Sequence, residues 1–371
     1  MSIKIMHTAD NHIGIEFRNQ PELRDRLKQE RLDAFRRIVT EANTRSCDFL
    51  VVAGDLFENI NVPQRLVREV CDILRSFTGE VLVVPGNHDY YEGADSRLWN
   101  FFKDAALGSN IHLLLRHEPE TFHADGREVI FYPCYCPSKH GQEHVIGWVA
   151  DMPKAADALH IGIAHGNVEG LGRDDEGNYF NMRPEDLRTA GVHCWLLGHI
   201  HAPSPQPGYV GRDLFFMPGT HTPEHVKRTT EGYAWFIDIE DAGSIRFERY
   251  RSGGIRFLRM ERTLHSLLDI NALSAELDHP EQGIAILDLH VSGRLSEDEI
   301  EALKTLDADL NARFLQVRMT SDIIKRIDAS QIAAEFPDGT YPQRLLSRLT
   351  ENPEDMQALQ LAYDIIKNMK P

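Results

Sequence analysis

The chain has 371 residues, enough for two or three domains, and its 42% hydrophobic and 26% charged residues are typical of a globular protein. Its formal charge of -17 argues against binding a polyanion through a generally basic surface, but not against nucleic acid at a site whose charge is set by bound metal. Five scattered cysteines, the lack of a long apolar run and the lack of a signal peptide predict a cytoplasmic protein with reduced thiols and no membrane attachment.

The first predicted strand, residues 3–7, is followed by a carboxylate and an imidazole, Asp10 and His12. In an extended segment, side chains two positions apart point to the same side, so we expect these two to converge. An oxygen ligand beside a nitrogen ligand suits Mn, Fe or Zn. A turn aspartate next to a surface histidine would explain the pair equally well.

The second predicted strand, residues 49–53, also ends in a carboxylate. Asp55 follows it after Gly54, a combination that is common and carries little weight alone. The helix predicted before this strand, residues 22–43, has an apolar stripe along one side. We expect that helix only to pack against the sheet.

The third predicted strand, residues 81–84, leads into the segment with the densest group of polar side chains. After Pro85 and Gly86 it presents an amide, an imidazole and a carboxylate in succession: Asn87, His88 and Asp89. Gly86 allows a sharp backbone turn at a point where a side chain would clash. Three polar groups at the end of a strand are what a catalytic loop needs, although one such cluster alone is weak evidence.

Two later predicted strands end in histidines. Residues 160–164 lead directly to His165. Residues 192–197 lead, after a glycine, to two histidines that are two positions apart, His199 and His201. Their spacing repeats that of the aspartate and histidine after the first strand.

Past residue 250 the pattern changes, and we expect a small α/β module at residues 251–328 followed by a helical segment at 329–371. In the module strands alternate with helices, and no strand ends in a polar cluster. A capping box, Ser296 with Glu299 three positions later, is expected to begin one helix. The apolar stripe of the terminal helices would pack in a core or, alternatively, dock a partner protein. The first domain would then cover residues 1–250.

Together, five strand ends present eight polar groups, seven of which can bind a metal directly. Sites in open α/β sheets gather at the carboxyl ends of the strands, so we expect these groups to meet. The mixture of carboxylates, imidazoles and one amide, without a thiolate, suits two Mn²⁺ or Fe²⁺ ions better than a structural zinc. The eight groups are those of Asp10, His12, Asp55, Asn87, His88, His165, His199 and His201.

The order of these motifs resembles that of the calcineurin-like metallophosphoesterases: Asp-x-His, Gly-Asp, Gly-Asn-His-Asp, His-Gly and Gly-His-x-His, between residues 10 and 201. The sequences at 7–14, 54–57 and 197–203 are similar to those of the SbcD-type DNA repair exonuclease subgroup. This resemblance implies an α/β fold with a four-layer α/β/β/α sandwich, in which helices flank two β-sheets. A small α/β capping domain and C-terminal helices would complete the chain.

The resemblance also implies a site with two divalent ions, with Mn²⁺ favoured and Fe²⁺, Mg²⁺ or Zn²⁺ as alternatives. Such a pair clamps a phosphodiester and activates the attacking water. One ion would bind Asp10, His12 and His201, the other would bind Asn87, His165 and His199, and Asp55 would bridge the two.

Two neighbouring residues are implied to act without binding metal. His88 would lie over the phosphate, where it would stabilise the developing charge or protonate the leaving oxygen. Asp89 would either orient His88 by a hydrogen bond or have a purely structural role in the turn.

Two residues depart from the pattern of the subgroup. Glu58 stands where an aspartate or a histidine is common, beside the expected bridging ligand, which leaves the fine choice of substrate open. His221 ends the sequence Gly-Thr-His where Gly-Ser-Pro is common, and it is a candidate phosphate contact.

The function implied first is that of a metal-dependent DNA nuclease in DNA repair, paired with an SbcC-type, SMC-like ATPase and able to form a homodimer through helices near the active site. The alternative is a phosphodiesterase for a small nucleotide or phosphate ester. A third function, that of a non-catalytic scaffold, has no need of the complete ligand set. A nuclease requires an open groove with basic residues around it, for which Arg97, Lys103 and Arg173 are candidates, whereas a small substrate requires a closed pocket.

Overall fold

The computed structural model describes residues 2–171, 177–206, 215–223, 231–241, 244–278, 281–327, 329–351 and 356–368. The chain divides into two units, Met1–Ile255 and Arg256–Pro371. All the predicted metal ligands lie in the first unit. None of the helices in the described ranges combines the length and the apolar character that crossing a bilayer requires.

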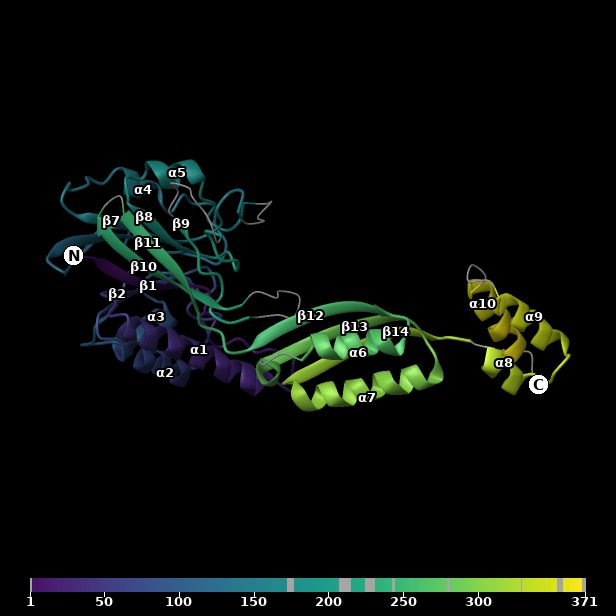
Figure 1. The fold of residues 1–371 in the computed structure, drawn as a ribbon. Helices are drawn as coiled ribbons and strands as arrows, with labels where there is room; N and C mark the ends of the chain where they lie inside the picture. The colour runs from purple at the N-terminus through teal and green to yellow at the C-terminus, as the bar shows by residue number, and fades with distance from the viewer. Residues whose placement is uncertain are drawn as a thin grey trace. The chain divides into compact units, whose positions relative to one another are not determined.

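The first sheet of unit 1 has six strands in the order β11-β10-β1-β2-β3-β4, of which β11, β10, β1 and β2 are labelled in Figure 1. Its strands are β1 (Ile3–Thr8), β2 (Phe49–Ala53), β3 (Glu80–Val84), β4 (Ile111–Leu113), β10 (Tyr233–Asp241) and β11 (Ser244–Arg251). Strands β1 to β4 are parallel neighbours, whereas β10 is antiparallel to both β1 and β11. The carboxyl ends of β1, β2 and β3 therefore meet at one edge, which is where Asp10, Asp55 and Asn87 follow them.

The second sheet has five strands in the order β5-β6-β7-β8-β9. They are β5 (Glu120–Ala124), β6 (Arg127–Cys134), β7 (Leu159–His165), β8 (Cys194–Gly198) and β9 (Phe215–Phe216). All are parallel except β5, which forms an antiparallel pair with β6. Since β7 ends at His165 and β8 ends just before His199, this sheet supplies His165, His199 and His201 of the site.

The two sheets pack face to face in the middle of unit 1. Alternate residues such as Ile5 of β1, Val51 of β2 and Ile161 of β7 form one buried apolar cluster between the sheets. Helices α1 (Arg24–Thr44), α2 (Gln64–Arg75) and α3 (Arg97–Ala105) cover the outer side of the first sheet, and α4 (Gly147–Ala150) and α5 (Pro184–Thr189) that of the second. The expected four-layer α/β/β/α sandwich is confirmed.

Unit 2 begins with three parallel strands, β12 (Arg256–Leu264), β13 (Ala285–Leu295) and β14 (Gln316–Lys325). Residues such as Leu287, Leu289 and Val291 of β13 form one core with α6 (Leu267–Glu276) and α7 (Glu297–Arg313). A short 3-10 turn, Gln282–Ile284, precedes β13. This part is the small α/β module that the sequence predicts.

The chain ends in three helices, α8 (Ala329–Glu335), α9 (Tyr341–Thr350) and α10 (Met356–Asn368). They share a small core of Ile327, Ile332, Phe336, Leu346, Leu359 and Tyr363. Core packing, the first alternative for the apolar stripe, therefore holds for Leu359 and Tyr363. The expected division of the chain at residues 250 and 328 stays a prediction.

Helix α7 begins with the capping box that the sequence predicts. The Ser296 hydroxyl accepts a bond from the Glu299 amide, and the Glu299 carboxylate accepts one from the Ser296 amide at 2.7 Å. We expect Ser296→Ala to lower the free energy of unfolding of this unit by about 1 kcal/mol, because the Glu299 amide in the first turn loses its hydrogen-bond acceptor. Ser296→Asp, which keeps an acceptor, should cost little. Urea unfolding of both variants tests this, and an equal loss in both would contradict it.

Candidate metal centre

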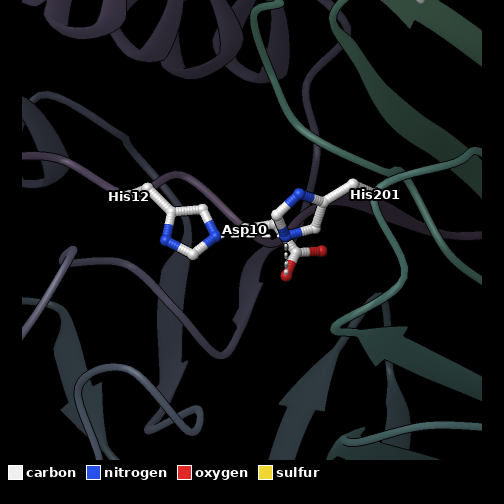
Figure 2. A group of neighbouring side chains, drawn as sticks. All are labelled: Asp10, His12 and His201. Carbon is white, nitrogen blue, oxygen red and sulfur yellow. Dashed lines mark hydrogen bonds and ion pairs between the residues drawn. The ribbon is translucent and has the colours of Figure 1, made fainter. Parts of the chain in front are cut away.

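Three of the predicted ligands meet where β1 and β8 end. Figure 2 shows the carboxylate of Asp10 with the imidazoles of His12 and His201. The Nε2 atom of His201 lies 3.7 Å from Oδ1 of Asp10 and 3.2 Å from Nε2 of His12. One atom from each residue lies within 4.8 Å of the others, so a single ion could contact all three.

Asp55 lies between this group and a second one. Its Oδ2 atom is 3.7 Å from Nε2 of His12 and 3.2 Å from Nε2 of His165. The same nitrogen of His165 is 4.0 Å from Oδ1 of Asp10. Asp55 is 1% exposed and contacts imidazoles of both groups, which is the position expected of a shared ligand.

Asn87 joins His165 and His199 in the second group. Its Oδ1 atom is 3.0 Å from Nε2 of His165 and 3.0 Å from Nδ1 of His199. The backbone amide of His199 donates to Oδ1 of Asp10 at 2.9 Å, which ties the two groups together. The structure thus brings all seven predicted ligands into one cluster, in which His199 and His201 are partly buried and the other five are buried.

The backbone at the site is not the extended segment that the sequence suggests. Asp10, His12, Asp55 and His199 have φ values of 51°, 44°, 52° and 93°, in the left-handed region. The Asp10 amide donates to the Gly54 carbonyl and the His12 amide to the Asp55 carbonyl, which turns the chain after β1 toward the loop after β2. The expectation of extended geometry is wrong, yet the side chains converge because the two loops are bonded together. Such strained residues are concentrated at functional sites.

Two glycines leave room for the cluster. A Cβ atom on Gly54, which has φ +85°, would lie 2.1 Å from Nδ1 of His165, and one on Gly86 would lie 2.2 Å from Oδ1 of Asp55. The clash predicted at Gly86 from the sequence is confirmed. Any larger residue at either position would displace a predicted ligand.

Burial and close neighbours shift the pKa values of several groups in the cluster. Burial alone would raise the pKa of Asp55, but the imidazoles of His165 and His12 outweigh it and hold that pKa well below its usual range. Burial would lower the pKa of His165, yet the Asp55 carboxylate outweighs it and raises the pKa to about 9. Burial and the neighbouring His165 lower the pKa of His199 to about 3, and burial raises the pKa of Asp10.

The donor set fits divalent metal. Two imidazole nitrogens, from His12 and His201, face each other at 3.2 Å, an arrangement that a cation between neutral rings would satisfy. Oxygen and nitrogen donors without a thiolate suit Mn²⁺ or Fe²⁺ rather than a structural zinc. The Asp55 carboxylate, which raises the pKa of His165, would place a negative charge beside the point where an ion would bind.

The structure separates the roles expected for His88 and Asp89. Asp89 accepts bonds from the Gly86 amide at 2.7 Å and the Phe57 amide at 3.0 Å, and burial together with Asp55 raises its pKa to about 7. The expected hydrogen bond from His88 to Asp89 is absent in the described part of the chain, since Nδ1 of His88 lies 2.9 Å from the Glu58 carbonyl instead. The structural turn role, the other alternative for Asp89, fits these contacts.

His221 is not placed to contact phosphate, contrary to the expectation from the sequence. It is fully buried, its Nε2 atom lies 2.9 Å from the Arg31 carbonyl, and its ring packs edge-on against Phe35. Arg31 is itself 1% exposed and donates to the Asn11 carbonyl at 2.7 Å, between two predicted ligands. Arg31 stands four residues after Leu27 and four residues before Phe35, on the apolar stripe of α1. This position in the sequence indicates that the arginine is buried.

Glu58 and Tyr179 adjoin the cluster, and neither was predicted to contact a metal ligand. The Oε2 atom of Glu58 lies 3.1 Å from Nδ1 of His12, and the Tyr179 ring centroid lies 5.0 Å from that of His199. Glu58 also lines a cavity of about 380 Å³ together with Asn59 and residues 14–20. Of the candidate basic residues, Arg97 and Lys103 are exposed on α3, and Arg173 lies outside the described residues.

Buried His7 on β1 gives a test by pH. It is fully buried beside Val51 and Trp235 of the adjacent strands, and neither ring nitrogen has a hydrogen-bond partner among the described residues. Burial lowers its pKa from 6.5 to about 3. Between these values the unfolded chain binds more protons than the folded one, so stability is present above about pH 6.5 and is lost as the pH falls toward 3.

We therefore expect the metal-free protein to lose up to about 1.4 kcal/mol more per pH unit than a His7→Leu variant between about pH 5.5 and 4. Urea unfolding at several pH values in the presence of a chelator measures the difference. The carboxylates of the site titrate in both proteins and cancel in the comparison. Parallel curves for the two proteins would show that His7 does not contribute.

Comparisons with known proteins give one family model and several relatives. A model of the calcineurin-like phosphoesterase family matches residues 3–203. The "DNA double-strand break repair protein Mre11" of Archaeoglobus fulgidus is 37% identical over 356 residues, which cover 90% of this chain and 74% of that protein. The "Uncharacterized metallophosphoesterase YhaO" of Bacillus subtilis is 26% identical over 260 residues, which cover 67% of this chain and only 60% of that protein. The crystal structure of the calcineurin-like phosphoesterase YfkN from Bacillus subtilis, at 14% identity, covers 68% of this chain and 91% of its own, with a TM-score of 0.42.

Proposed function

The chain belongs to the calcineurin-like phosphoesterase family and is a metal-dependent phosphoester hydrolase, and from this premise we propose that it is a two-metal DNA nuclease of the SbcD type acting in DNA repair. The observation that carries the proposal is the pair of buried donor groups that share Asp55. The relatives named as Mre11 double-strand break repair proteins support DNA as the substrate.

The ligand assignment follows the two groups. Asp10, His12 and His201 would hold one ion, Asn87, His165 and His199 the other, and Asp55 would contact both, with Mn²⁺ the preferred metal. When bound, such ions supply Lewis-acid stabilisation of the phosphoryl oxygens and lower the pKa of water. Backbone groups hold the side chains of Asp10, Asp55 and His165 in place, and such fixed positions would help to orient a bound phosphate, which is how positioning contributes to the rate.

His88 supplies the proposed acid. Its backbone amide donates to Oδ1 of Asp55 at 2.8 Å, so the residue is held directly beside the shared carboxylate. The ring stands edge-on to His12, with centroids 4.7 Å apart, and is only partly buried. From there it would reach a bound phosphate and donate a proton to the leaving oxygen or stabilise its charge.

The resemblance also supports an SbcC-type, SMC-like ATPase as partner, and a homodimer. On α10, Leu361 and Ile365 are 63% and 50% exposed and lie four positions apart, so they form an apolar strip on one side of that helix. This strip is where we would place a partner helix. Five buried free thiols are compatible with the reducing cytoplasm, where we expect the protein to encounter its DNA substrate.

The alternative is a phosphodiesterase for a small nucleotide or phosphate ester, and the charge of -17 is the observation in its favour. Digestion of end-labelled single- and double-stranded DNA with Mn²⁺ or Mg²⁺, beside bis(p-nitrophenyl) phosphate, distinguishes the two. An Asp55→Asn protein purified identically controls for contaminating nucleases. Cleavage of DNA supports the nuclease, cleavage of the small ester alone supports the alternative, and no cleavage of either would contradict both.

A further inference from the structure

Glu58 contacts two histidines of the centre with two different groups. Its carboxylate oxygen Oε2 lies 3.1 Å from Nδ1 of His12, and its backbone carbonyl lies 2.9 Å from Nδ1 of His88. Both contacts are made to the same ring nitrogen, Nδ1. In each ring this leaves Nε2 as the nitrogen that is not directed at residue 58.

The orientation of His12 gives this contact a consequence. Its Nε2 atom faces Nε2 of His201 at 3.2 Å and Oδ2 of Asp55 at 3.7 Å, so this nitrogen is directed at the centre and Nδ1 is directed away from it. A neutral imidazole carries its proton on one nitrogen and a lone pair on the other, and the partner of one nitrogen decides which. A carboxylate or carbonyl can only accept, so it holds the proton on Nδ1.

We propose that Glu58 is a positioning residue that sets the tautomer of both rings: its carboxylate holds His12 with Nε2 as the lone-pair donor to metal, and its carbonyl holds His88 in the same tautomer. A carboxylate behind a metal-bound histidine fixes the ring and strengthens its donor nitrogen. The proposal rests on His12 being a ligand, as proposed above. It also gives a chemical role to the position where this chain departs from the SbcD pattern.

A substitution of Glu58 can remove its contact with His12 but not its contact with His88. The carboxylate is 28% exposed, and it meets the His12 ring as an ion-pair contact at 3.1 Å rather than as an aligned hydrogen bond. The carbonyl belongs to the backbone and remains after any substitution. Changing the side chain therefore releases His12 while His88 stays held, and His88 serves as an internal control.

The first measurement reads the tautomers directly. Ring ¹⁵N shifts of the metal-free, histidine-labelled protein are recorded at mildly alkaline pH, with the two rings assigned from His12→Ala and His88→Ala spectra. We expect His12 to carry its proton on Nδ1 in the parent and to become a mixture of tautomers in Glu58→Ala, with His88 unchanged. An unchanged His12 spectrum in Glu58→Ala would overturn the proposal.

The second measurement is Mn²⁺ affinity by calorimetry. Glu58→Ala should weaken it by about 10–100-fold, and Glu58→Gln, whose amide oxygen still accepts from Nδ1, by less. Glu16→Gln is the matched control, because Glu16 lines the same cavity but pairs with Lys28 at 2.8 Å, and it should bind Mn²⁺ like the parent. Equal affinities in Glu58→Ala and Glu16→Gln would also overturn the proposal.

A wrong assignment of the metal ligands would give a different result from a wrong role for Glu58. If His12→Ala bound Mn²⁺ as tightly as the parent, the ligand assignment itself would be wrong. If His12→Ala lost Mn²⁺ affinity while Glu58→Ala did not, the proposed role of Glu58 would be wrong and the ligand assignment would stand. Circular dichroism of each variant confirms that the fold is retained before either comparison is made.

Discussion

Asp55→Asn is expected to reduce hydrolysis of bis(p-nitrophenyl) phosphate by about 10³-fold or more at saturating Mn²⁺. The shared carboxylate contacts imidazoles of both donor groups, at 3.7 Å from His12 and 3.2 Å from His165. An amide has a similar shape but brings no charge, so each ion would lose part of its neutralisation. Metal stabilisation of a phosphoryl transition state is worth several kcal/mol, and about 1.4 kcal/mol corresponds to tenfold in rate.

The control for this experiment is Asp33→Asn, which changes a partly exposed aspartate of α1 that pairs with Arg36 and is not among the predicted ligands. It should retain the parent rate. Calorimetry with Mn²⁺ adds a readout that does not depend on turnover, and Asp55→Asn should bind fewer ions or bind them more weakly than the control. A variant at position 55 with parental rate and parental Mn²⁺ stoichiometry would remove the basis for a centre with a shared ligand.

The positions of the proposed ligands could be predicted because strand ends are visible in the sequence. Apolar runs that stop at Asp55, Asn87 and His165 correspond to β2, β3 and β7, whose carboxyl ends lie at one edge of the sandwich. Parallel pairing of β1, β2 and β3 makes that edge a consequence of topology rather than of any single residue. Family resemblance added the assignment of each side chain to one ion, which no spacing rule supplies.

The local backbone could not be predicted in the same way. Asp10 and His12 were expected in an extended segment, whereas both have positive φ because their amides bond to the loop after β2. A contact between residues more than 40 positions apart decides that geometry, and a local pattern contains no information about it. The convergence of the two side chains was therefore predicted correctly from an incorrect premise.

Residues that support the ligands were the least predictable. His221 was a candidate for phosphate binding, yet it is enclosed against Arg31 and Phe35. Asp89 bonds backbone amides instead of His88. A polar residue near a motif can face the substrate or support the loop behind it, and burial, which distinguishes the two, follows from packing across the whole unit.

His88→Ala is expected to lower turnover by about 10²–10⁴-fold and to leave Mn²⁺ affinity unchanged. The residue is anchored beside Asp55 by its backbone amide, which the substitution retains, so the loss would come from the imidazole alone. His123→Ala, a change to an exposed histidine on β5, is the matched control and should behave like the parent. Loss of Mn²⁺ affinity in His88→Ala comparable to that in His12→Ala would instead make His88 a ligand, as the close group of His12, Asp55 and His88 would allow.

The choice between the two roles of His88 depends on the leaving group. If the imidazole protonates the leaving oxygen, His88→Ala should harm cleavage of DNA or of an alkyl ester far more than cleavage of a p-nitrophenyl ester, because nitrophenolate is a weak base and departs without a proton. If the ring only stabilises charge on the phosphoryl oxygens, both substrates should lose rate by the same factor. The Glu58 carbonyl, which holds the proton of His88 on Nδ1, leaves its Nε2 without a proton in the neutral ring. Protonation of the leaving group would therefore require the imidazolium form, in which Nε2 also carries a proton.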